Sequence, residues 1–160
     1  MKATTLLYRQ HRRIAQLAAV LEFEKSMRNP LLLELVEEVM AHVALEHNLF
    51  YPAAQRALDV SVDAHRKSHE QAKNALLVLA SARTDLKAFV ANVQDLRRIV
   101  QRHTQLDETT LFPRVERVLD DEALEDLGEE METFQGTLLS VCGPRAARDP
   151  RRVTRAHGAP

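Results

Sequence analysis

Two histidine–carboxylate pairs are the residues whose spacing points most directly to chemistry. Glu46 follows His42 by four residues, and Asp107 follows His103 by four residues. In a helix, residues four apart lie one above the other on the same face, so both members of a pair can reach ions on one axis. Imidazole and carboxylate donors together suit iron or manganese. The spacing therefore predicts a site for such a metal.

The two pairs belong to an internal repeat. Residues 40–52 (MAHVALEHNLFYP) and 100–113 (VQRHTQLDETTLFP) each place an acid four residues and a proline ten residues after a histidine. Upstream, QHRRIAQLAAVLE and SHEQAKNALLVLA align His11 with His69. The chain is thus two helix pairs in a pseudo-twofold relation. A two-metal site fits that symmetry, because each half offers one histidine from its first helix and a histidine plus an acid from its second.

Long helices must position these residues. Ala, Leu, Glu, Arg and Gln dominate the chain up to Cys142 and favour helix throughout. Capping residues and prolines predict five helices: about 5–27, 30–58 beginning after Asn29, a third from Asp59 or Ser61 to 82, a fourth from Thr84 or Asp85 to 119, and a shorter fifth from Asp120 or Asp121 to 141. Pro52 and Pro113 are expected to kink or break their helices.

Four long helices with short loops predict an all-α fold, an up-down-up-down four-helix bundle, with a short fifth C-terminal helix. We expect residues 1–142 to form this domain. Residues 143–160 carry Gly, Pro and five Arg and show no apolar periodicity. We expect them to be a disordered Arg-rich tail.

Each long helix carries an apolar stripe that alternates three and four residues and faces the bundle axis. About two of every seven helical positions lie on such a stripe, so chance would place roughly two of the 7 histidines there. Five histidines and two acids lie on the stripes, which also include Leu49 and Thr110: His11, His42, Glu46, His65, His69, His103 and Asp107. Burying such groups unpaired costs several kcal/mol each, so a bound cation must pair with them.

Composition narrows the remaining classes of function. The net charge is -1, which gives no global field for nucleic acid or a membrane surface. No run approaches the ~20 apolar residues of a membrane span. The N-terminus lacks the apolar stretch of a signal peptide, and the single cysteine, Cys142, has no internal partner. We expect a cytoplasmic protein.

The ordered set of motifs resembles the hemerythrin HHE cation-binding pattern over about residues 5–115. The resemblance implies a hemerythrin-like bundle that holds two non-haem iron ions, or manganese, with an oxo or hydroxo bridge. It also implies the distribution of ligands. His11 and His42 would bind one metal, and His65, His69 and His103 the other, while Glu46 and Asp107 bridge the two. One coordination position would stay open for a small molecule.

Two ligand assignments have alternatives. Some hemerythrins place the second acid five residues after its histidine, which here is Glu108; Asp107 is preferred because Glu108 lies ~100° off the stripe. Many members have one clear histidine on the third helix. The repeat selects His69, whereas a rise of ~1.5 Å per residue from the loop places His65 nearer the level of His103. Both histidines are therefore kept.

The functional hypotheses fall into three classes. The first is binding or sensing of dioxygen or nitric oxide at the open metal position. The second is a di-iron enzyme that decomposes hydrogen peroxide, with Tyr8, His47 or Glu108 as proton donors. The third is a non-catalytic iron-holding module. The aromatic residues Phe50, Tyr51 and Phe112 are predicted to be core residues at the bundle end. The oligomeric state does not follow from the sequence.

Overall fold

The computed structural model describes residues 1–24, 30–81 and 85–142, and within these ranges the secondary structure is helical, with no β-strand. The elements in chain order are α1 (Ala3–Glu24), α2 (Pro30–Leu45), η1 (Glu46–Phe50), α3 (Tyr51–Leu58), α4 (Asp63–Ser81), α5 (Leu86–Leu106), η2 (Asp107–Leu111), α6 (Phe112–Val118) and α7 (Asp121–Cys142). The all-α prediction is confirmed. The expected tail, 143–160, lies outside the described residues.

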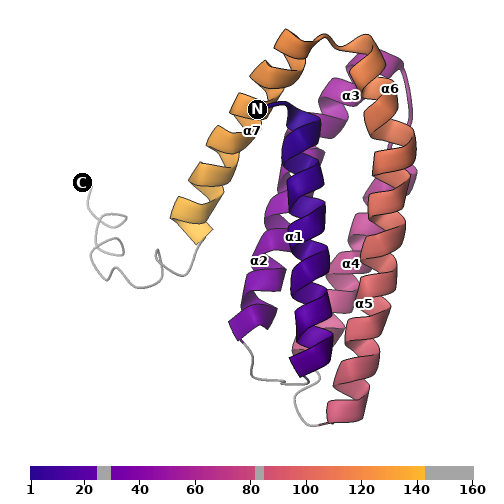
Figure 1. Ribbon diagram of the computed structural model, residues 1–160, viewed down its shortest axis with the longest axis vertical. Coiled ribbons are helices and arrows are strands. Elements are labelled where there is room, and N and C mark those ends of the chain that lie inside the picture. Colours follow the sequence, from indigo (N-terminus) through magenta and orange to yellow (C-terminus); the bar gives the residue numbers. More distant parts are fainter. Residues whose placement is uncertain (25–29, 82–84, 143–160) are drawn as a thin grey trace, which may run out of the picture.

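The long helices α1, α2, α4 and α5 lie side by side (Figure 1). Helix α1 packs against α2 and α5, and α4 packs against α5 and α2, so the four helices enclose a common interior. The short helices α3 and α6 continue α2 and α5 and contact each other at one end. Both halves of the repeat therefore meet around this interior.

A π-helical turn lies at the acid of each repeat. In η1 the backbone N–H of Tyr51 donates to the carbonyl of Glu46, and in η2 the N–H of Phe112 donates to the carbonyl of Asp107. A proline follows each turn and cannot donate a backbone hydrogen bond. The expected break at Pro52 and Pro113 is thus a local widening of a helix that continues into α3 or α6. Such π-bulges are frequent at functional sites.

The wide turns also shift the buried face of each helix. Leu49 is half-buried and Thr110 exposed, although the stripes predicted both to be buried. The next residues, Phe50 and Leu111, are buried in their place. A π turn contains one residue more than an α turn, so every later position moves along by one.

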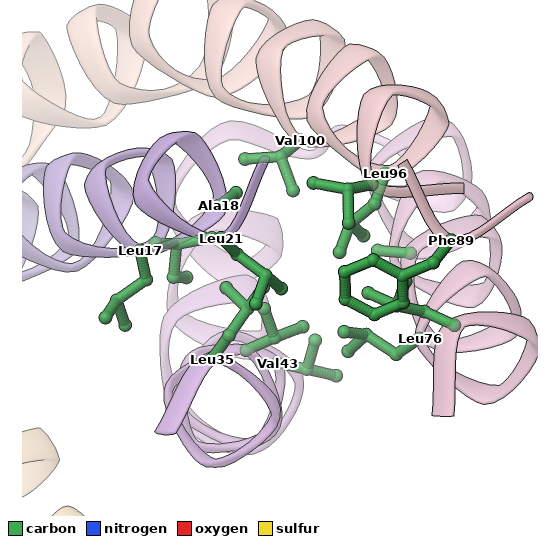
Figure 2. Packing of buried hydrophobic residues seen from close by; sticks show 14 residues of the cluster. Leu17, Ala18, Leu21, Leu35, Val43, Leu76, Phe89, Leu96 and Val100 are labelled. Atoms are coloured by element: carbon green, nitrogen blue, oxygen red, sulfur yellow. The ribbon is translucent and has the colours of Figure 1, made fainter. Parts of the chain in front are cut away.

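The apolar core has two parts. One lies toward the C-terminal end of α1 and the N-terminal end of α2 and includes Leu21, Leu35, Leu76 and Leu96. Figure 2 shows side chains of this cluster, which come from α1, α2, α4 and α5, pointing toward one another. The other surrounds α3 and α6, with Phe50, Tyr51 and Phe112 fully buried as predicted.

The prediction of a short fifth helix is wrong. Helix α7 has 22 residues, as many as α1, and it packs against α1 and α2 on the outside of the bundle. Met131 and Leu124 bury its apolar side. The N-terminus lies close to α7, since a Cβ at Gly128 would come within 1.8 Å of the Met1 carbonyl oxygen.

Two helices begin at capping residues that the sequence predicts. The Asp85 side chain accepts from the N–H groups of Lys87 and Ala88 at the start of α5, and Asp120 accepts from Ala123 before α7. Of the two residues predicted to cap the third helix, Asp59 instead ends α3 with φ 50, and Ser61 Oγ accepts from the N–H of Asp63 at the start of α4. The predicted ends at 27 and 82 and the caps at 29 and 84 lie outside the described residues. Among the residues described, no helix is long and apolar enough to cross a membrane.

Candidate metal centre

The predicted ligands lie between the two apolar clusters. Along α1, for example, His11 stands between Leu7 of one cluster and Ile14 of the other. All seven predicted side chains are buried, with at most 7% of any residue exposed. The structure therefore gathers charged and polar groups inside an apolar interior, where each needs a partner.

The donor atoms of these side chains point toward one another. Nε2 of His103 lies 3.0 Å from Nε2 of His42 and 3.0 Å from Nε2 of His69. Nε2 of His69 lies 3.1 Å from Oε2 of Glu46, and Nε2 of His103 lies 2.9 Å from Oδ2 of Asp107. One group of donors, with atoms all within 4.8 Å of one another, is His11, His42, Glu46 and His103.

Two of these buried atoms, His11 Nε2 and Glu46 Oε1, have no hydrogen-bond partner among the described residues. Leaving such atoms unpaired costs about 1–3 kcal/mol each, and more when the group is charged. Nitrogens that meet at 3.0 Å also compete for protons, since a neutral imidazole has only one N–H. A cation in the middle would satisfy both conditions, so the donor set fits a bound metal.

The outward nitrogens of four histidines have partners of their own. Nδ1 of His11 lies 2.9 Å from Oε1 of Glu108, and Nδ1 of His42 lies 3.3 Å from Oε1 of Gln10. The other two pairs are His69 Nδ1 with His47 Nε2 at 3.0 Å and His103 Nδ1 with Ser68 Oγ at 2.9 Å. An acceptor on Nδ1 places the proton there and leaves Nε2 free to bind a metal.

Asp107 and Glu108 occupy different positions. Asp107 is fully buried, whereas the side chain of Glu108 is 29% exposed and contacts His11 from outside. The structure thus brings Asp107, and not Glu108, into the cluster of donors. The stripe argument predicts this difference.

The two histidines of α4 also differ. His69 lies level with His103, and His65 lies one turn away, with its Nδ1 hydrogen-bonded to Oδ1 of Asp107. The rise count placed His65 nearer the level of His103 than His69, and it is therefore wrong. The count depended on the position of the loop between the third and fourth predicted helices, which the sequence does not fix to within several residues. In this geometry His65 reaches the cluster through Asp107.

Sequence reasoning missed the site role of Tyr51. Its hydroxyl donates to Oε2 of Glu46 at 2.5 Å, and its ring stacks on His69 with centroids 5.8 Å apart. In an α-helix a residue five positions after Glu46 is rotated by ~500° about the helix axis, which leaves it ~140° away from the direction of Glu46. The π turn η1 brings the two together. A tyrosine just before the proline of the repeat is the only signal that the sequence gives.

Burial and neighbouring charges shift the pKa values of the cluster. Burial lowers the pKa of His42 well below its usual range, with His11 adding to the effect, and lowers that of His69 to about 2, with His103 adding to it. Burial and the charge of Asp107 raise the pKa of Glu46 well above its usual range. Burial also opposes ionisation of Asp107, but hydrogen bonds from His103 and His65 overcome it and hold that pKa low.

These shifts predict how the metal-free protein responds to acid. A histidine whose pKa is lowered by folding stabilises the folded state above its unfolded value of about 6.5 and loses that contribution as the pH falls. Each such histidine adds a slope of about 1.4 kcal/mol per pH unit. The raised pKa of Glu46 acts in the opposite direction, but several histidines outweigh one acid. Urea unfolding of metal-free protein should show stability falling between pH 7 and 5.

The variant His69→Gln checks the assignment. It removes one titrating imidazole, so its stability should fall less steeply with pH than that of the wild type. A metal-free protein equally stable at pH 7 and pH 5 would show that the histidines are charged or solvated in the folded state.

Comparison with known proteins supports the class of site. The hemerythrin HHE cation-binding domain pattern matches residues 2–115. A solved hemerythrin HHE cation-binding domain-containing protein from Mycobacterium kansasii is 25% identical, and the match covers 91% of this chain and 96% of that one with a TM-score of 0.71. Comparison with curated protein sequences gives no match.

The matched segment includes every predicted ligand and both π turns, and it covers well over half of the chain. Three findings together identify the family: the fold, the buried cluster of imidazoles and carboxylates, and this match. The chain belongs to the hemerythrin HHE cation-binding domain family.

Proposed function

We propose that the protein holds two non-haem iron ions in the core of an up-down-up-down bundle and binds dioxygen or nitric oxide at one of them. The observation that carries the proposal is the buried cluster of imidazoles and carboxylates in which donor atoms lack partners and three Nε2 atoms converge. Membership of a cation-binding family supports it.

The proposed ligands follow the geometry. The ring centroids of His11 and His42 lie 4.8 Å apart and those of His69 and His103 lie 4.2 Å apart, which supports one pair of histidines for each metal. Glu46 and Asp107 are the two carboxylates that face the middle, so they would bridge the metals. His65 would act by holding Asp107.

Iron is favoured by the donor types. A structural zinc site takes four ligands, usually with cysteine, and this cluster has more donors than that and no thiolate. Manganese is the alternative because its ligand preferences overlap with those of iron. When bound, iron supplies a redox-active Lewis acid, and the protein supplies a dry, preorganised set of donors.

The enclosure of the cluster favours small ligands. Its donors are almost completely buried, and none of the seven predicted ligands lines the three surface cavities between α4 and α5, between α1 and α5, and along α7. A diatomic molecule or peroxide can pass between packed helices, whereas a sugar, nucleotide or peptide would require the bundle to open.

Anaerobic reconstitution tests this function. Protein loaded with Fe(II) should give a charge-transfer band when dioxygen is added, and a distinct band with nitric oxide. A reversible dioxygen band would support carriage or sensing. Iron-loaded protein with no spectral response to dioxygen, nitric oxide or peroxide would contradict the proposed function and favour an iron-holding role.

Peroxide decomposition is the second candidate, and Tyr51 favours it. The net reaction converts two molecules of hydrogen peroxide into two of water and one of dioxygen, and it needs protons to move at the site. Burial raises the pKa of Tyr51, so its hydroxyl stays protonated and faces Glu46. Tyr51→Phe should slow dioxygen release from peroxide while iron content stays unchanged. Equal rates for the variant and the wild type would remove this support.

A further inference from the structure

The two halves of the centre are built alike but carry different outer partners. In the first half, consecutive residues Glu46 and His47 contact the two nitrogens of His69: Oε2 of Glu46 lies 3.1 Å from Nε2, and Nε2 of His47 lies 3.0 Å from Nδ1. One side chain approaches from the centre and the other from outside.

The second half repeats this arrangement around His11. Consecutive residues Asp107 and Glu108 contact its two nitrogens: Oδ2 of Asp107 lies 3.8 Å from Nε2, and Oε1 of Glu108 lies 2.9 Å from Nδ1. His11 and His69 are the residues that the internal repeat aligns, and both pairs belong to a π turn. The correspondence is therefore residue by residue.

The outer partners differ in charge. For Nε2 of His69 to bind a metal, its Nδ1 must carry the proton, which His47 then accepts. A histidine that accepts a hydrogen bond is neutral, because the doubly protonated ring has only donors. Glu108 places a carboxylate at the same position on His11. A carboxylate acceptor makes the imidazole a more basic ligand than a neutral acceptor does.

An aromatic ring stacks on each of the two histidines, Tyr51 on His69 and Phe112 on His11, so the stacking is alike and the partner of Nδ1 differs. The ring of His11 stacks on Phe112 with centroids 5.7 Å apart and an angle of 9° between the ring planes, while Glu108 contacts Nδ1. Both contacts come from residues of η2 and the start of α6. A single short segment therefore sets the position and the basicity of this histidine.

We propose that Glu108 and His47 are positioning residues that make the two metal positions unequal, the position at His11 binding its metal more tightly because Glu108 is a carboxylate. The inference rests on the proposed two-metal centre. It gives Glu108 a role through His11 in place of direct ligation.

Stepwise metal binding by the full chain tests the inference. Anaerobic titration with Fe(II) against a competing chelator should give two steps for the wild type, and His11→Ala should remove the tighter one. Glu108→Gln keeps the shape but not the charge and should weaken the tighter step about 10- to 100-fold. His47→Gln should weaken only the other step. Glu116→Gln, an exposed carboxylate on α6, is the matched control and should change neither.

Exchanging the partners gives a second test. Glu108→His copies the first half and should bring the two steps closer together, as should His47→Glu by strengthening the weaker step. The reduction potential of the metal at His11 should rise in Glu108→Gln, since removal of the negative charge disfavours the oxidised ion, and a purely structural role would not move it.

The outcomes separate the two proposals. A wild type that binds no metal overturns both the proposed function and this inference. Two ions bound by the wild type, with Glu108→Gln matching Glu116→Gln in both steps and in potential, overturn the inference alone. Weakening of the same step by Glu108→Gln and His47→Gln overturns it as well.

Discussion

Glu46→Gln should remove most of the bound metal while leaving the protein folded. Glu46 is fully buried, and its Oε2 faces Nε2 of both His69 and His42. An amide is a far weaker metal ligand than a carboxylate, so loss of a proposed bridge should weaken both metal positions. We expect a loss larger than the about 10- to 100-fold that follows from losing an outer hydrogen-bond partner.

The metal-free variant should be at least as stable as the metal-free wild type. Burial raises the pKa of Glu46, which means that the ionised carboxylate is disfavoured in the folded protein without metal. A neutral amide of the same shape removes that cost and still accepts from Tyr51. Circular dichroism and urea unfolding therefore separate loss of a ligand from loss of the fold.

Glu38→Gln provides the control on the same helix. Glu38 is half-buried two turns before Glu46 and also has a pKa raised by burial, but it lies outside the cluster of donors. It should keep full metal content by elemental analysis. If Glu46→Gln retained metal at the level of Glu38→Gln, Glu46 would not be a ligand.

Removal of the metal should lower the thermal unfolding midpoint strongly. Each ion present at about 1,000 times its dissociation constant stabilises the folded state by about 4.1 kcal/mol, so two ions give about 8 kcal/mol. For a domain of this size about 1 kcal/mol corresponds to about 2–4 °C, which predicts a decrease of roughly 15–30 °C. Calorimetry of loaded and chelator-treated protein measures it.

The physical reason is the cost of the buried donors. Without a cation, Glu46 Oε1 and His11 Nε2 have no partner, and imidazole nitrogens face one another at 3.0 Å. The variant Glu46→Gln should show only a small decrease with chelator, because it has little metal to lose. Equal midpoints for loaded and chelator-treated wild type would mean that the cluster is satisfied without metal.

The sequence predicts most of the helices and the cluster, because periodicity reports which face of a helix is buried. His11, His42, His69 and His103 stand out as polar residues on apolar stripes, and the structure brings them together. The same reasoning predicts that Asp107 faces the cluster and that Glu108 does not. These features depend on spacing along single helices, which sequence gives directly.

Other features depend on geometry between or within helices that spacing does not fix. The π turns move the buried position from Leu49 to Phe50 and from Thr110 to Leu111, and they bring Tyr51 onto Glu46. The level of His65 depends on how far α4 and α5 are offset. The outer partners Gln10 and Ser68 are polar residues beside the stripes, and only packing shows that they face His42 and His103.

The most direct test of the two-metal centre is the metal content of the reconstituted wild-type chain. Protein loaded anaerobically with Fe(II), freed of excess metal and analysed by elemental mass spectrometry should contain two iron ions per chain, and Mössbauer spectra of an iron-57 sample should show two inequivalent sites. Retention of no metal, or of a single zinc ion per chain under competition, would contradict the account.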